Sequence, residues 1–299
     1  MDIEEKTMQQ LRGTSATLRK RNVVALPGQL VIESDTHQGK VGDGTTAYNA
    51  LPYLGQPEPK ELTESWESLR ARIVAGDFWN IHIGDYKPIT LTTGEVVIME
   101  VAGIDQYYHC GDTVIGHHID FISRDCLAGK RRMNATATNN GTASEPHPWR
   151  ASELFGKLNN VTTGVFATLP EDLKPCIIEK RAVMEERYSK GGAVAADTTW
   201  SWCNAGKLWL PTEVEVFGHA SWSDPGRGTA GGGCNRHYPI FPSHMIKCNG
   251  NGGSRVNWWT ASACLDLKNH FCDVTGTGSC SRMEANDMTQ CVPLCFRIG

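Results

Sequence analysis

The residues best suited to chemistry gather in one segment near the C-terminus, NWWTASACLDLKNHFCDVTGTGSC (257–280). Thiolates, imidazoles and carboxylates bind metal ions and transfer protons, and the segment holds several of each. A structural zinc site normally includes a tight Cys-x2–4-Cys pair, whereas 5, 1 and 7 residues separate Cys264, His270, Cys272 and Cys280. The spacing argues against zinc, so we expect neither a metal ion nor a cofactor here.

A second candidate site is the segment 117–120, His-His-Ile-Asp. Its His-x-Asp spacing is that of a non-haem iron facial triad, which His219 could complete. The surrounding TVIGHHIDFIS has the pattern of a strand, with Ile115, Ile119 and Phe121 as its apolar residues. This pattern favours a structural, hydrogen-bonded histidine over a metal ligand.

The chain has 11 cysteines and contains no Cys-x-x-Cys pair. Secreted disulfide scaffolds are smaller and usually have an even number of cysteines, so we expect reduced, partly buried thiols. Cys291 and Cys295 are four residues apart in an expected final strand, and a period of two places both on one face of a sheet. We expect both in the core.

Composition excludes several classes of partner. Of 299 residues, 40% are hydrophobic, and the net charge is −4, so the chain can bury a core but has no basic surface for nucleic acid. Its apolar runs are too short for a membrane span, so we expect no membrane insertion. The acidic, polar N-terminus lacks the apolar stretch of a signal peptide, and we expect folding in a cytosol.

Residues 1–55 predict a small β-rich module. GQLVIES alternates as a half-buried strand does, and DTHQGK and GDG predict tight turns. So small a unit buries little surface alone, which indicates association with further copies. Residues 56–78 predict a Pro-containing linker and then a helix, for which Thr63 is the expected N-cap.

Residues 79–299 predict an α+β domain with long, irregular loops. ITLTTGEVVIMEVAGI reads as a hairpin, 150–160 and 162–168 as helices, and Thr212 as the cap of a short helical turn. QCVPLCFRIG reads as a closing strand. Long Gly-rich loops on a folded frame commonly carry function.

The N-terminal module resembles that of phage tropism-determinant and tail-fibre proteins. The matching motifs are RGT (12–14), GQLVIESDT (28–36) and the segment 40–53, which contains GDGTTAY and ends in LPY. Gln29 stands where glutamate is more usual in that family. The resemblance implies attachment to other tail or baseplate proteins and a homotrimer.

Residues 79–299 resemble a domain of unknown function that is common in phage and gut-bacterial proteins. The matching motifs lie at 83–86, 118–127, 152–154, 169–173, 208–218, 258–262 and 292–298. That family is similar to C-type-lectin-like folds, which include formylglycine-generating enzymes and the variable proteins of diversity-generating retroelements. The resemblance implies a lectin-like fold whose C-terminal end varies.

Together the resemblances imply a phage receptor-binding protein of the virion, made in the bacterial cytoplasm, with no catalytic residues. Its ligand would be a bacterial surface protein or glycan. Adjacent strand residues face opposite sides, so we expect one of Trp258 and Trp259 in the core and the other at the binding side. The expected contact residues are Asn257, Trp259, Asp266, Lys268, Asn269, His270, Ser279, Ser281, Arg282, Met283 and Asn286.

Two alternatives remain open at this point. A copper-dependent, cysteine-oxidising enzyme of the formylglycine-generating type would need two cysteines close together in a cleft. A purely structural tail protein would need no receptor, and exchange of residues 257–290 would leave its host range unchanged.

Overall fold

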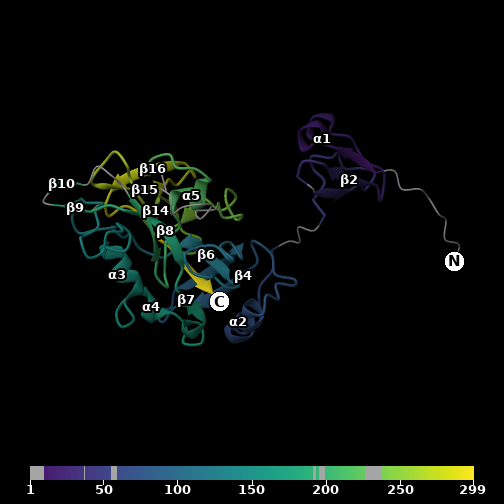
Figure 1. Cartoon of the computed structure of the whole chain (residues 1–299). Helices are drawn as coiled ribbons and strands as arrows, with labels where there is room; N and C mark the ends of the chain where they lie inside the picture. The colour runs from purple at the N-terminus through teal and green to yellow at the C-terminus, as the bar shows by residue number, and fades with distance from the viewer. Residues whose placement is uncertain (1–9, 37, 55–58, 191–192, 195–198, 226–236) are drawn as a thin grey trace. The chain divides into compact units, whose positions relative to one another are not determined.

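The computed structural model describes residues 10–36, 38–54, 59–190, 193–194, 199–225 and 237–299 (Figure 1). The chain divides into two compact units, Met1–Glu58 and Pro59–Gly299. We expected a helix between two domains in residues 56–78. That helix, α2 (Trp66–Val74), instead packs within the second unit, because Trp66, Leu69 and Ile73 are buried in its main core. Its N-cap is Ser65 rather than Thr63.

The first unit is a three-stranded sheet with one short helix. Strand β2 (Leu30–Glu33) pairs in parallel with β1 (Leu11–Gly13) and antiparallel with β3 (Gly39–Val41), and α1 (Ser15–Arg21) follows β1. Among its described residues, Leu18, Ala25, Val31 and Tyr48 form one small buried apolar cluster, and Leu51 is buried as well. Several large aliphatic side chains are exposed instead: Val23, Val24, Leu26, Val41 and Leu54.

The second unit is α+β, as the sequence predicts. Its main sheet is antiparallel, with the order β4 (Tyr86–Thr90), β5 (Val96–Ile104), β6 (Ile119–Cys126), β17 (Pro293–Ile298) and β7 (Ile177–Ile178). A smaller antiparallel sheet has the order β14 (Trp258–Ala263), β15 (His270–Val274) and β16 (Cys280–Glu284). In Figure 1 the smaller sheet lies at the end of this unit away from α2 and β7.

Short elements complete the second unit. The helices are α3 (Glu153–Asn159), α4 (Val165–Thr168), the 3-10 turn η1 (Lys174–Cys176) and α5 (Glu213–Phe217), which begins at a capping box formed by Thr212 and Glu215. Strands β8 (Arg181–Glu186) and β11 (Thr199–Asn204) pair, as do β9 (Ser189–Lys190) with β10 (Ala193–Val194) and β12 (Lys247–Cys248) with β13 (Arg255–Val256).

Buried ion pairs lie within the main sheet and at α5. The Arg297 guanidinium donates from Nε and Nη2 to the two oxygens of Asp120, at 2.7 and 2.8 Å, and Tyr238 donates to the same carboxylate. Lys180 Nζ lies 2.5 Å from Glu215 Oε1. These groups are almost fully buried, and their charges balance, which is the condition under which buried ions are tolerated. The first pair joins β6 to β17, and the second joins Lys180 to the start of α5.

Candidate binding surface

The smaller sheet supports the segment in which the sequence predicts contacts. Strand β16 lies at the end of the strand order and pairs with β15 from His270↔Glu284 to Val274↔Cys280. We use the name C-terminal surface for β16 together with the loop 264–269, the turn 275–279 and the segment 285–289.

The buried residue Asn139 holds the loop 264–269 from the interior of the protein. Its side-chain Nδ2 lies 3.1 Å from the carbonyl oxygen of Cys264 and 2.7 Å from those of Leu267 and His270. Arg187, also buried, donates to the carbonyl of Cys264 as well. Because these bonds are to backbone atoms, they fix the path of the loop whatever side chains it carries.

A second support joins this loop to β16 through Trp222. The buried carboxylate of Glu213 accepts the backbone N–H groups of 221–223, at 2.9 to 3.2 Å. The carbonyl of Trp222 then accepts the N–H of Leu265 at 2.8 Å. The guanidinium of Arg282 lies 3.9 Å above the Trp222 ring, in the geometry of a cation–π contact. Arg282 therefore stabilises the frame and is only partly exposed.

Side-chain amides hold the remaining parts of the surface. Asn257 Oδ1 accepts the N–H of Gly276 at 2.8 Å, which fixes the turn that follows β15. Asn269 donates to Glu284 Oε1 at 3.0 Å, and its Oδ1 lies 2.8 Å from His270 Nδ1. Asn257, Asn269 and His270, all predicted as contacts, are thus half-buried and engaged within the protein.

Four exposed side chains of the C-terminal surface, unlike those half-buried residues, make no bonds with the described part of the chain. Asp266, Lys268, Ser279 and Asn286 are exposed, and their side chains make no hydrogen bond or ion pair with any residue in the described ranges. Ser281 and Met283 are half-buried on β16. The surface therefore combines a fixed backbone with outward side chains that the fold does not use.

The expectation for the tryptophan pair is wrong. Both Trp258 and Trp259 are fully buried, so Trp259 is not a surface contact residue. Their indole N–H groups donate to the carbonyls of Met245 and Arg131, at 2.9 and 2.8 Å. Both are buried because both faces of β14 are covered, so alternation along the strand moves neither ring to solvent.

A buried acid lies on β15 beneath the C-terminal surface. Asp273 is 1% exposed and pairs with Trp259 on one side and Ser281 on the other. The pKa of Asp273 is raised to about 7, chiefly by burial and also by the nearby Asp287, while the Ser281 hydroxyl acts in the opposite direction. No hydrogen bond of standard geometry reaches either carboxylate oxygen from the described residues. The sequence pattern did not indicate this burial.

The cysteines and histidine of the segment do not form a metal cluster in the part of the chain that is described. Cys264 and Cys272 are fully buried, and burial raises the pKa of the Cys272 thiol well above its usual value. Cys280 is half-buried, and burial lowers the pKa of His270. Cys291 and Cys295 are both buried, which confirms the prediction that they lie in the core.

The histidines at 117–118 are structural, as the strand pattern indicates. His118 is buried, with Nδ1 at 2.8 Å from the Gly116 carbonyl and Nε2 accepting the N–H of Tyr107. His117 Nδ1 lies 2.7 Å from Asp105 Oδ2. With these nitrogens engaged and Asp120 held by Arg297, the residues are not arranged as a facial triad.

The residues that the sequence analysis missed are the supports: Asn139, Arg187 and Glu213. Asn139 and Arg187 lie 125 and 77 positions before Cys264, whose carbonyl they hold, and Glu213 lies 8 to 10 positions before residues 221–223. The capping box formed by Thr212 and Glu215 marks the start of α5 in the sequence, but it does not mark Glu213 as a support.

Comparison with protein-family models, with curated proteins and with solved structures found no match in any of the three. None of the helices in the described ranges combines the length and apolar character needed to cross a membrane.

Proposed function

We propose that this chain is the receptor-binding protein of a phage tail and that its C-terminal surface contacts a molecule on the bacterial cell, a protein or a glycan. One observation carries the proposal: the backbone of this surface is fixed from within, while Asp266, Lys268, Ser279 and Asn286 are exposed and unused by the fold. On this proposal the protein is made in the bacterial cytoplasm and ends in the virion.

A fixed backbone favours recognition for an energetic reason. Binding costs conformational entropy when loops become ordered, and a loop that is already ordered avoids that cost. Side chains that make no internal contacts can also change without loss of fold stability. A C-type-lectin-like frame whose outward positions are diversified by a retroelement would need both properties.

The first unit supports the proposed attachment and trimerisation. The buried apolar cluster of this unit is small for independent stability, and the exposed aliphatic residues, among them Val24 and Leu26, gain from burial against other copies. Three joined copies would convert weak single contacts into strong avidity. Analytical ultracentrifugation of the full chain should then give the mass of a homotrimer.

The enzymatic alternative gains no support from the cysteines of the described residues. Such an enzyme needs two cysteines together in an open cleft, whereas the described cysteines are mostly buried: Cys126, Cys176, Cys203, Cys264, Cys272, Cys291 and Cys295. Cys234 lies outside the described residues. We therefore propose recognition as the function.

The proposal is tested by the binding of the fluorescently labelled chain to a panel of bacterial strains, measured by flow cytometry. The triple variant Asp266→Ala, Lys268→Ala, Asn286→Ala should lose binding by ~10-fold or more, because these side chains would make the contacts. Its thermal stability should remain that of the wild type.

The matched control is Thr63→Ala, Glu67→Ala, Lys130→Ala, which removes three exposed side chains that make no hydrogen bond or ion pair with the described residues. It should bind as the wild type does. Equal binding by the two triple variants, or a wild-type chain that binds none of the strains while it oxidises a cysteine peptide with copper, contradicts the proposal.

A further inference from the structure

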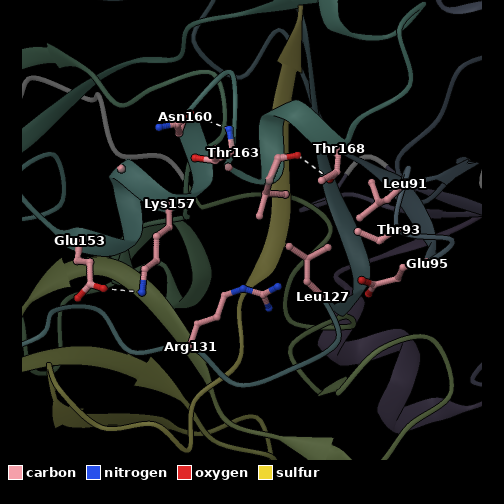
Figure 2. A pocket seen from close by; sticks show the side chains of 13 residues that line it. Leu91, Thr93, Glu95, Leu127, Arg131, Glu153, Lys157, Asn160, Thr163 and Thr168 are labelled. Carbon is pink, nitrogen blue, oxygen red and sulfur yellow. Dashed lines mark hydrogen bonds and ion pairs between the residues drawn. The ribbon is translucent and has the colours of Figure 1, made fainter.

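The second unit contains a cavity of about 560 Å³. Its lining includes no residue of the C-terminal surface. It lies between the turn that joins β4 to β5, the segment after β6, and helices α3 and α4. Figure 2 shows its lining side chains, with Arg131 reaching into the cavity between Lys157 and Leu127. This volume falls within the usual range for small-molecule sites.

Arg131 presents one free edge of its guanidinium to this cavity. Its Nη1 donates to the carbonyls of Ala128 and Gly129, at 3.0 and 3.1 Å, which fixes the plane of the group. Its Nε and Nη2 make no hydrogen bond with any residue in the described ranges. The Nε–Nη2 edge has two parallel N–H groups, the arrangement that binds a carboxylate through both of its oxygens.

The remaining lining residues suit a hydroxylated ring more than a purely apolar ligand. Asn160 Oδ1 accepts the N–H groups of Thr162 and Thr163, at 2.8 and 2.9 Å, so its Nδ2 stays available as a donor. Thr93 and Thr163, which carry hydroxyl groups, also line the cavity. Leu91, Leu127 and Val165 supply an apolar wall.

The other charges of the cavity are largely balanced. Glu153 is paired with Lys157 at 2.5 Å and with Arg132 at 3.1 Å, so its negative charge is neutralised. Glu95 Oε1 accepts the N–H of Ala128 at 2.6 Å. Arg131 therefore offers two parallel N–H groups to a ligand, Lys157 keeps further donors beside its bond to Glu153, and Glu95 can accept from a ligand hydroxyl.

We propose that this cavity binds a sugar acid, with the carboxylate on the Nε–Nη2 edge of Arg131 and the ring hydroxyls on Thr93, Thr163 and Asn160. The apolar wall accommodates the C–H face of the ring. A free sugar acid and a uronic acid residue of a surface glycan share this chemistry. The site is separate from the C-terminal surface, so the outcome of its test is independent of the proposed function.

The test is a set of titrations of the full chain followed by saturation-transfer NMR. The probes are sodium glucuronate, an oligosaccharide of glucuronate, glucose, acetate and inorganic phosphate. Glucuronate should bind at least ~10-fold more tightly than glucose or acetate, because it alone combines carboxylate and ring. Tighter binding of the oligosaccharide assigns the site to a glycan, and equal or weaker binding assigns it to the free acid.

Two variants locate the site. Arg131→Gln should weaken glucuronate binding by ~10-fold or more while leaving glucose unchanged, because the backbone bonds of residue 131 persist. Gly156→Leu should block the cavity without removing a contact, since a Cβ at Gly156 meets nothing within 4 Å. Ala71→Leu, on the exposed side of α2, is the matched control and should bind normally.

Three results overturn the proposal: glucuronate that binds no better than acetate or phosphate, binding that persists in Gly156→Leu, and equal losses in Gly156→Leu and Ala71→Leu. If Arg131→Gln does not fold, Gly156→Leu decides alone.

Discussion

Asn139 offers the sharpest test of the idea that the C-terminal surface is fixed from within. The substitution Asn139→Ala removes the amide group that donates hydrogen bonds to three backbone carbonyls. The Cys264 carbonyl keeps its bond from Arg187, and the His270 carbonyl keeps the N–H of Cys264. The Leu267 carbonyl loses its one partner among the described residues.

The magnitude follows from that difference. The part-buried carbonyl of Leu267, left without a protein partner, costs roughly 1–3 kcal/mol at most, and two weakened bonds add roughly 0.5 kcal/mol each. We therefore expect Asn139→Ala to lower the free energy of unfolding by about 2–4 kcal/mol. The loss of stability should be concentrated in the loop 264–269, because the bonds that are removed end on the backbone of this loop and of His270.

Two measurements check this expectation. Urea denaturation gives the change in the free energy of unfolding, and hydrogen exchange followed by mass spectrometry gives the protection of residues 264–270. Exchange in this segment should rise far more than in β5 and β6. A loss below about 1 kcal/mol with unchanged exchange of the loop would refute the reasoning, since the loop would then be ordered by other contacts.

Two further predictions concern buried charges. The folded-state pKa of Asp273, about 7, lies above its usual 3.8. Between these two values the folded state holds a proton that the unfolded state has released. The free energy of unfolding should therefore fall as the pH rises from about 4 to 7, by at most about 4 kcal/mol. Asp273→Asn should reduce this pH dependence in urea unfolding at pH 5 and pH 8, and an unchanged slope would place the carboxylate in solvent. Arg297→Met should destabilise the fold by roughly 3–5 kcal/mol, because it leaves Asp120 buried without its partner. The double variant Arg297→Met, Asp120→Leu should recover much of that loss in thermal denaturation, and a double variant as unstable as the single one would show that the pair does more than balance charge.

Much of the secondary structure was predictable because it depends on local signals. Thr212 with Glu215 three positions later marks the start of α5, and the apolar spacing of Trp66, Leu69 and Ile73 marks α2. Cys291 and Cys295 are both buried as predicted, although β17 begins at Pro293, so that Cys291 lies outside the strand. The lectin-like classification and the receptor-binding role depend on resemblance and stand as proposals.

The candidate surface was predictable only in part. Asp266, Lys268, Ser279 and Asn286 are exposed where polar loop residues are expected. Trp259 failed as a contact because alternation along β14 says nothing about what covers each face. Tertiary packing covers both faces, and this information is spread over segments far apart in the chain.

The sequence by itself determined the α+β class, the small N-terminal module and the polar C-terminal segment, because propensity, capping and alternation act over a few residues. Only the tertiary structure decided which of those polar residues are free. Asn139 meets the loop 264–269 across more than a hundred positions, and Arg187 reaches the carbonyl of Cys264 across 77 positions. Long-range contacts of this kind form only when the core brings distant segments together, and for that reason no local pattern encodes them.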